Sequence, residues 1–502
     1  MGRIFPCVVP IRQGSNVLNK PSDQDSLELS KFGYTQRLRR TMNAFSSFAI
    51  SFSLISITTG IFAGFSFGFR EVGPIIIWSW TIVLFGQLLM ATVIAELSTR
   101  FPLAGYGYQW TSRLMNPHYG YFVGWLLLLQ FLTGFPGVCY ALAEYSHGFF
   151  GLPHGFPVSW LTVVIISVIA VTHIAGIRIA SLVNDYGVIA EIIGVILITV
   201  VLLGMFGFSQ ETDWSQLFKS VNWRTGEAAT FSSFCLSLLM GAWCLTGFEA
   251  AADMAEETRN PRKVVPRAVI SAELTSGIAG FLMLVGFLIA IPNIESIQAS
   301  ETPLLDILGA HFGSTTTTIT MIFVFISIFA CGVASMAATT RLIFSLARDN
   351  MLPASTLLKS VHATRQSPTG AIAIVALISI AVVLILDDLA KITSVSATAG
   401  YLGYSAIALC ALLAKPGDTS GEYFSLGRLR KPICLIAIVW TLGVVGALTI
   451  PKIDGGHQSA ISTSIGIAAG IILYFLFVYS RIRQGTAGPT SEQDYPASEE
   501  AE

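Results

Sequence analysis

The sequence predicts an all-α polytopic membrane protein with twelve transmembrane helices. Of its 502 residues, 53% are hydrophobic and only 12% are charged, whereas an average soluble domain has about 25% charged residues. The hydrophobic residues fall in blocks of roughly twenty, the length that crosses a hydrocarbon core of about 30 Å as a helix. The Lys and Arg residues are sorted between alternate connections. So little charge cannot cover a water-exposed surface, which excludes a soluble globular domain.

The hydrophobic blocks are bounded by charged residues or by Pro and Gly clusters, and they give twelve candidate spans in chain order. Five precede a long polar connection, at residues 42–69, 73–98, 118–150, 157–175 and 180–207. Five follow it, at residues 229–254, 267–292, 315–346, 368–386 and 392–414. Two more lie at 432–450 and 460–480. An even number of spans places both termini on the same side of the membrane.

The basic residues indicate which side that is. With both termini in the cytoplasm, the 29 Lys and Arg residues all fall on cytoplasmic segments except Arg70, Lys219, Arg224, Lys391 and Lys452. This sorting follows the positive-inside rule and supports the even number of spans. We therefore expect an integral protein of the plasma (or cell inner) membrane with cytoplasmic tails at 1–41 and 481–502.

Three of the connections between the predicted spans are long. Residues 208–228 and 293–314 are predicted on the outer side, and residues 415–431 form a cytoplasmic loop. The second outer connection contains an amphipathic stretch from Pro303 to Leu308. This stretch either caps a pathway through the bundle or is an ordinary surface loop.

Two spans contain Thr-Gly pairs at mid-length, which predicts a matched pair of interrupted helices. The first pair lies in Thr58, Thr59, Gly60 and Ile61, and the second in Leu245, Thr246 and Gly247. Backbone that leaves its helical hydrogen bonds inside a bilayer must meet protein or a ligand. The two sites are five spans apart, as expected if residues 42–207 and 229–414 are inverted repeats. Half-helix N-termini attract anions and freed carbonyls attract cations, so the site would suit a zwitterion.

Close helix packing is the alternative interpretation of the first site. Gly60, Gly64 and Gly68 form a row of small residues at a spacing of four, which lets helices approach each other closely in membranes. Two sites at corresponding positions favour the binding interpretation.

Several motifs resemble those of amino acid permeases of the amino acid–polyamine–organocation superfamily. The most specific is the run from Gly247 to Pro261, with Pro266, Arg267 and Ala268 after it. Residues 59–62 (TGIF), 95–98 (AELS) and 341–349 (RLIFSLARD) resemble the same family. The chain looks closest to the amino acid/choline branch, which includes permeases for GABA. The resemblance implies the five-plus-five inverted repeat of leucine transporters (the LeuT-like fold), two additional C-terminal helices, and alternating access.

The resemblance also implies roles for two residues of the sixth span. Trp243 lies six positions before Glu249, a spacing that is similar in arginine–agmatine antiporters. There the aromatic ring stacks over the substrate and the carboxylate takes part in proton-linked gating. Trp243 alternatively packs in the bundle. A carboxylate near mid-membrane costs about 2.5–3.5 kcal/mol on insertion scales, which favours a functional Glu249.

The coupling ion is predicted from Glu191 in the fifth span. Many relatives have Lys at this position, where it serves as a fixed cation in place of an ion. A protonatable Glu191 suits proton coupling and an ionised one suits sodium; we favour the proton. Ser335 and Thr339 in the eighth span are a possible ion site against the first span, although such hydroxyls usually bond within their own turn.

The predicted function is a secondary active permease, a symporter for amino acids or related small amines such as GABA. The alternatives are a non-transporting nutrient sensor of the same fold and an amino acid exchanger. The seven cysteines form no CxxC pair, and we expect no metal, no cofactor and no nucleic-acid partner. The GxSxG match at 64–68 lies in an apolar helix, where a hydrolase nucleophile does not occur, so we expect no enzyme activity. The partners are a small-molecule substrate and the lipid bilayer, and the oligomeric state stays open.

Overall fold

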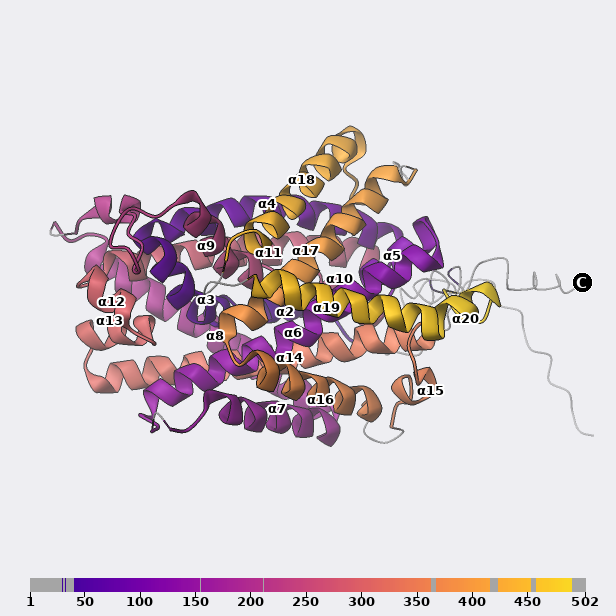
Figure 1. The fold of residues 1–502 in the computed structure, drawn as a ribbon, viewed down its shortest axis with the longest axis horizontal. Coiled ribbons are helices and arrows are strands. Elements are labelled where there is room, and N and C mark those ends of the chain that lie inside the picture. The colour runs from indigo at the N-terminus through magenta and orange to yellow at the C-terminus, as the bar shows by residue number, and fades with distance from the viewer. Residues whose placement is uncertain are drawn as a thin grey trace, which may run out of the picture.

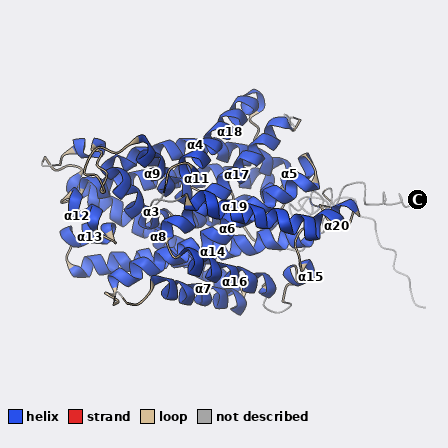
Figure 2. Ribbon diagram, viewed as in Figure 1, coloured by secondary structure: helices blue, strands red, loops and turns tan. Residues whose placement is uncertain are grey.

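The computed structural model describes residues 29, 32, 40–153, 155–210, 212–362, 367–415, 423–452 and 457–489, without the side chains of residues 177 and 178. Our expectations for most of both tails, and for residues 416–422 of the connection at 415–431, lie outside these residues. Within them the chain consists of helices and loops (Figure 2). Extended pairing among the described residues is confined to one isolated bridge between Met42 and Thr258.

Each of the twelve predicted spans contains helix. The first five hold α2 (Ala44–Ile55), α3 (Ile57–Val72), α4 (Ile76–Arg100), α6 (Pro117–Phe149), α7 (Val158–Ala175) and α8 (Ile177–Phe206). The next five hold α9 (Phe231–Cys244), α10 (Ala250–Asp253), α11 (Pro261–Ile289), α14 (Ser314–Arg348), α16 (Thr369–Leu386) and α17 (Leu389–Leu413). The last two hold α18 (Arg430–Thr449) and α19 (Gln458–Leu473), which continues through η5 (Tyr474–Val478) into α20 (Tyr479–Arg483).

Short helices fill the connections. They are η1 (Gly73–Ile75), α5 (Tyr106–Leu114), η2 (Trp214–Phe218), η3 (Ala255–Glu257), α12 (Ile294–Ala299), α13 (Pro303–His311), α15 (Ser355–Leu358) and η4 (Gly427–Leu429). The amphipathic stretch predicted at 303–308 forms α13, which buries Leu304, Ile307 and Leu308 and packs against α3 and α14. It is therefore a packed helix at the end of α3.

Among the described residues, ten helical segments are long and apolar enough to cross a membrane. One of them, Ala44–Arg100, contains two predicted spans, and α9 is apolar but has only 14 residues because its span is interrupted. The all-helical, polytopic architecture predicted from composition is confirmed.

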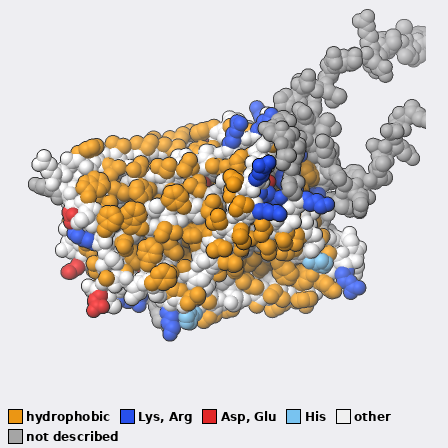
Figure 3. All heavy atoms as spheres, turned by 90° about the horizontal axis from the view of Figure 1, so that it is seen from above, with side chains coloured by type: hydrophobic (Ala, Val, Ile, Leu, Met, Phe, Trp, Pro, Cys, Tyr) orange, Lys and Arg blue, Asp and Glu red, His pale blue; other side chains and the backbone are white. Residues whose placement is uncertain are grey.

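The long helices run mostly along the long axis of the molecule (Figure 1). Helices α12 and α13 lie at one end, which we call the loop end, and α5, α15 and α20 lie at the other, which we call the terminal end. On the face shown in Figure 3, hydrophobic side chains cover the middle of the surface between the two ends. On the face shown in Figure 3, basic side chains gather mainly toward the terminal end, in line with the sorting seen in the sequence.

The residues that precede α2 pair with the backbone that follows α10. The Met42 amide donates to the Glu257 carbonyl at 3.0 Å, and the Arg259 amide donates to the Met42 carbonyl at 3.0 Å. The Arg40 guanidinium donates to the Thr258 carbonyl at 2.8 Å. These bonds join the start of α2 to the segment after α10 at the terminal end.

Arg430 fastens α18 to the rest of the bundle. Its Nη2 donates to the carbonyls of Ala411 and, at 2.7 Å, Ala414, which end α17. Its Nε lies 3.8 Å from Oε2 of Glu96 on α4, and both residues are buried. The guanidinium thus satisfies the last carbonyls of one helix and the carboxylate of another.

We predict that Arg430→Leu lowers the free energy of unfolding by about 3–5 kcal/mol, because it leaves the buried Glu96 carboxylate without its cation. Thermal or denaturant unfolding of the purified protein measures the change. The double variant with Glu96→Leu should recover much of the loss, since both charges are then absent. Equal stability of the single and double variants would contradict a contribution from the pair.

Candidate functional site

The first interrupted helix breaks at Ser56. Helix α2 ends at Ile55 and α3 begins at Ile57, with Ser56 between them in the left-handed region at φ 40°. The Ser56 hydroxyl accepts a hydrogen bond from the Thr59 amide at 3.4 Å and so caps α3. The interruption therefore precedes the position expected from the Thr-Gly pair, and residues 58–60 form the first turn of α3.

The second interruption lies where the sequence predicts it, between Cys244 and Ala250. Gly247 has φ +102°, a conformation that favours glycine. A Cβ on Gly247 would lie 2.9 Å from Cγ and 3.0 Å from the carbonyl carbon of Leu54 on α2. The second break thus packs directly against the last turn of α2.

The backbone freed at the second break is held by side chains from two other helices. Gln87 Nε2 on α4 donates to the Leu245 carbonyl at 2.6 Å. Ser51 Oγ on α2 donates to the Phe248 carbonyl at 2.8 Å and accepts from the Ala251 amide at 2.9 Å. The interruption is therefore a fixed part of the bundle.

A small cavity lies between the two breaks. Its walls come from the breaks and from α6, α14 and α17, and its lining carries no charged side chain. Among the predicted substrate-binding residues, the lining includes Thr59, Gly60, Trp243, Thr246 and Gly247. The structure thus brings the two predicted sites together around one cavity.

Three predicted substrate-binding residues, Thr58, Ile61 and Leu245, are buried outside this lining. Successive residues of a helix point about 100° apart, so Thr59 and Gly60 turn their neighbours Thr58 and Ile61 away from the cavity. The Leu245 side chain is fully buried in the core. None of these three lines the cavity.

Trp243 separates this cavity from a second one nearer the loop end. The second cavity is larger than the first, and Trp243 lines both. Its other walls include Arg70, Glu144, Trp223 and Asp388. An indole at this position lies between the two cavities.

Glu249 lies behind the second break and outside the cavity lining. Its carboxylate accepts from the Gly247 amide at 3.0 Å and from the Tyr404 hydroxyl at 2.7 Å. Gln130 Nε2 lies 3.5 Å from the same carboxylate, and Gln130 does line the cavity. Glu249 thus stabilises the unwound segment directly and reaches the cavity through Gln130.

Glu191 on α8 lies at the first break. Its buried carboxyl group lies beside the Ser56 hydroxyl and the backbone amides of Ile57 and Thr58, and its Oε1 has no hydrogen-bond partner among the described residues. These amides are among the first four of α3, which have no partner within the helix and attract anions. The Glu191 carboxyl group therefore lies at the N-terminus of α3, beside the first break.

The possible ion site is only partly assembled. Ser335 lines the cavity, whereas the Thr339 hydroxyl donates to the Ser335 carbonyl at 2.7 Å, within its own helix. Within the part of the chain that the structure describes, no group of three or more His, Cys, Asp or Glu side chains could hold a metal ion.

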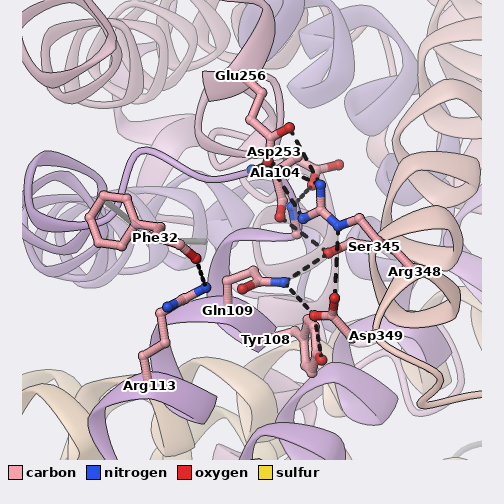
Figure 4. Close-up of polar contacts among 11 residues, drawn as sticks. Phe32, Ala104, Tyr108, Gln109, Arg113, Asp253, Glu256, Ser345, Arg348 and Asp349 are labelled. Carbon is pink, nitrogen blue, oxygen red and sulfur yellow. Dashed lines mark hydrogen bonds and ion pairs between the residues drawn. The ribbon is translucent and has the colours of Figure 1, made fainter. Parts of the chain in front are cut away.

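A polar network closes the terminal end of the bundle (Figure 4). Arg348 on α14 pairs with Glu256 after α10 at 3.4 Å, and the Glu256 carboxylate accepts from the Ala104 amide at 3.1 Å. Asp253 accepts from the Gly105 amide at 2.8 Å. On α5, Tyr108 and Gln109 each donate to Asp349 at 2.8 Å; Figure 4 shows these groups converging. The network joins α5, α10 and α14.

Gln87 and Gln130 are the functional candidates that sequence reasoning missed. Each is the single amide side chain in an otherwise apolar stretch of its span, and polar groups inside a membrane are costly. That signal could have identified both residues. Their partners, the Leu245 carbonyl and Glu249, are far away in the sequence and could not be inferred from it.

Comparison with known proteins identifies the family of the chain. The model of the family described as "Amino acid permease" matches residues 42–478. The chain belongs to the amino acid permease family. It is therefore an integral membrane protein of a transporter family, as the sequence motifs indicated, and not an enzyme.

Three relatives illustrate the range of the family. The chain is 27% identical to amino-acid permease BAT1 of Arabidopsis thaliana, over 86% of this chain and 89% of that one. It is 25% identical to thiamine transporter thi9 of Schizosaccharomyces pombe, over 84% and 79% of the two chains. It is 23% identical to a putative polyamine transporter of Candida albicans, over 96% and 92%.

We predict that Gly247→Ala destabilises the protein by about 1–3 kcal/mol, because alanine is strained at this φ and its Cβ would overlap Leu54. The midpoint of thermal unfolding measures the effect. Gly226→Ala is the control, since Gly226 also has positive φ (68°) but open space around it. If Gly226→Ala lowers the stability less than Gly247→Ala, the difference is due to the contact of residue 247 with α2. An equal loss of stability in both variants would contradict a contribution from that contact.

Proposed function

We propose that this permease is a secondary active transporter that moves an amino acid or a related small amine, such as GABA, by alternating access coupled to protons. The observation that carries the proposal is the cavity between two interrupted helices. Trp243 separates it from the second cavity, and the network around Glu256 and Arg348 closes the terminal end. Alternating access requires a barrier on each side of the site, because the site must open to only one side at a time.

The proposed architecture has twelve spans, with inverted repeats at 42–207 and 229–414 in the LeuT-like arrangement and two further helices at 432–480. The two breaks support it, because they fall in the first and sixth predicted spans and α3 packs against α9. The sorting of basic residues supports placing the terminal end, with both tails, in the cytoplasm of a cell whose plasma membrane holds the protein.

Proton coupling is supported by the positions of Glu249 and Glu191. Each buried carboxyl group contacts the backbone of one interrupted helix. Gain or loss of a proton changes which hydrogen bonds these groups can accept or donate, and so affects the stability of each break. Sodium coupling would need an ion site, for which Ser335 is the described candidate.

We predict that the full chain in liposomes accumulates a labelled amino acid or amine, GABA included, when an inward proton gradient is imposed. Collapse of the gradient with a protonophore is the control and should abolish accumulation. Saturable exchange without gradient-driven accumulation would indicate an exchanger. Binding without flux would indicate a sensor, and neither binding nor flux across a broad panel would contradict the proposal.

We predict that Glu249→Gln abolishes gradient-driven accumulation while exchange of internal for external substrate persists, because glutamine keeps the acceptor but cannot carry the proton. Comparison of net uptake with exchange in the same liposomes measures this. Glu295→Gln, at an exposed carboxylate on α12, is the matched control. Full accumulation by Glu249→Gln would remove Glu249 from the coupling mechanism.

A further inference from the structure

Glu273 is a buried carboxyl group that lines neither cavity. It lies near the middle of α11, and its side chain is fully buried. Neither carboxyl oxygen has a hydrogen-bond partner in the part of the chain that the structure describes. A buried carboxylate without a donor or a cation is strongly unfavourable, above all inside a membrane. The protonated, uncharged form of Glu273 is therefore the stable one in this conformation.

Helices α4 and α11 lie side by side (Figure 1), and their contacts fix the register between them. A Cβ added to Gly280 would overlap the Trp80 indole, and one added to Gly277 would overlap Leu84. The contacts thus move forward along α4 as they move back along α11. The two helices are therefore antiparallel, and the same register can be extended by one turn.

One further turn along each helix brings Gln87 opposite Glu273. Gln87 is also fully buried, and its Nε2 donates to the Leu245 carbonyl at 2.6 Å, at the second break. Its Oε1 has no hydrogen-bond partner among the described residues. An unpaired acceptor on α4 therefore faces a carboxyl group that has a proton to donate.

The two protonation states of Glu273 act differently on Gln87. A protonated carboxyl group can donate to Gln87 Oε1, whereas a carboxylate only accepts. The donated bond leaves Gln87 Nε2 on the Leu245 carbonyl, and the second break keeps this support. A carboxylate competes with that carbonyl for Nε2, because a charged acceptor forms the stronger hydrogen bond. Loss of the proton therefore weakens the contact between α4 and the second break.

Glu249, which contacts the same break, has the opposite environment. Its oxygens accept from the Gly247 amide at 3.0 Å and from the Tyr404 hydroxyl at 2.7 Å, which suits a carboxylate. Glu249 and Glu273 also interact electrostatically, and two like charges in one buried region disfavour each other. The negative charge is thus favoured on Glu249 and the proton on Glu273.

Protonation of Glu273 also depends on the other groups around it. Cys244 on α9 and Tyr401 on α17 interact with it electrostatically, and both are neutral at physiological pH. Helix α2 and η2, which pack against α11, carry no titratable side chain. The remaining elements packed against α11 carry charged residues at the ends of the bundle, at the first break or on the exposed face of α8: Arg70, Glu71, Glu96, Arg100, Asp185, Glu191, Asp253, Glu256 and Glu257.

We propose that Glu273 and Glu249 share one exchangeable proton, which Glu273 holds in this conformation, and that Gln87 transmits the protonation state of Glu273 to the second break. When the terminal end opens, the O–H bond of Glu273 breaks, the proton passes to water, and the carboxylate that forms accepts from Gln87 Nε2. Glu273 is then a coupling residue and Gln87 a positioning residue. This inference rests on the proposed function, to which it adds both residues.

Infrared spectroscopy of the purified full chain tests the protonation state without transport. We expect the difference spectrum of wild type minus Glu273→Gln at neutral pH to show the C=O stretch of a protonated carboxyl group. Glu96→Gln is the matched control, since Glu96 is also buried but pairs with Arg430 and should show carboxylate stretches alone. A carboxylate signal for Glu273, from a variant with a monodisperse elution profile, would overturn the inference.

Gln87→Leu tests the contact between the two helices. Leucine removes the acceptor, so the C=O stretch of Glu273 should move to higher frequency, as for a carboxyl group whose O–H loses its hydrogen bond. Ser79→Ala is the control, because the Ser79 hydroxyl is also buried on α4 but donates to the carbonyls of Ile76 and Ser237. A C=O stretch that does not move in Gln87→Leu would overturn the connection of Glu273 to the second break.

In liposomes, Glu273→Gln should lose accumulation driven by the proton gradient while exchange of internal for external substrate persists, because glutamine cannot release a proton. Full gradient-driven accumulation by this variant would overturn the coupling role and leave the transport proposal intact. If the wild-type chain neither accumulates nor exchanges any substrate, the proposed function fails. The spectra then still decide whether Glu273 binds the proton and whether Gln87 accepts its hydrogen bond.

Discussion

The structure depends on how backbone groups that leave helical hydrogen bonding are satisfied inside an apolar bundle. An unpaired amide or carbonyl has no water to bond there and costs several kcal/mol. Each break is therefore surrounded by short polar side chains from neighbouring helices. Cys244 lies 3.9 Å from the Ile55 carbonyl and Cys331 lies 3.7 Å from that of Leu54, while Ser51 and Gln87 serve the second break. These contacts stabilise the two breaks, and the cavity lies between them.

The fold was largely predictable because a bilayer imposes simple lengths. Twenty apolar residues make a helix whatever lies around it, so span positions could be inferred from local composition alone. The second break could likewise be inferred locally, because Gly247 is a residue type that favours the positive φ found there. Ser56 does not, because a serine in an apolar span most often bonds its own turn. Its role as a cap depends on its left-handed backbone conformation, at φ 40°, which the sequence does not show.

The candidate site was predictable only in part, for the same reason. Trp243 and the Thr-Gly pairs are local signals, and the structure brings most of them to one cavity. The role of Glu249 depends on Tyr404 and Gln130, which come from two other helices. A sequence shows that a buried carboxylate needs partners, but only the packing shows that those partners connect it to the cavity. The finer details of the site are therefore tertiary properties.

The pairing of Met42 with the segment after α10 has a mechanical consequence. Two backbone hydrogen bonds join the start of α2 to residues 257–259, and Ser51 joins α2 to the segment around α10 a second time, nearer the breaks. Helix α10 cannot swing away from α14 without carrying α2 along or breaking these bonds. Helices α2 and α10 are thus coupled, and they would rotate together about the breaks. Opening at the terminal end would then be a concerted step. Separation of Glu256 from Arg348 would also displace α2, which ends at the break at Ser56.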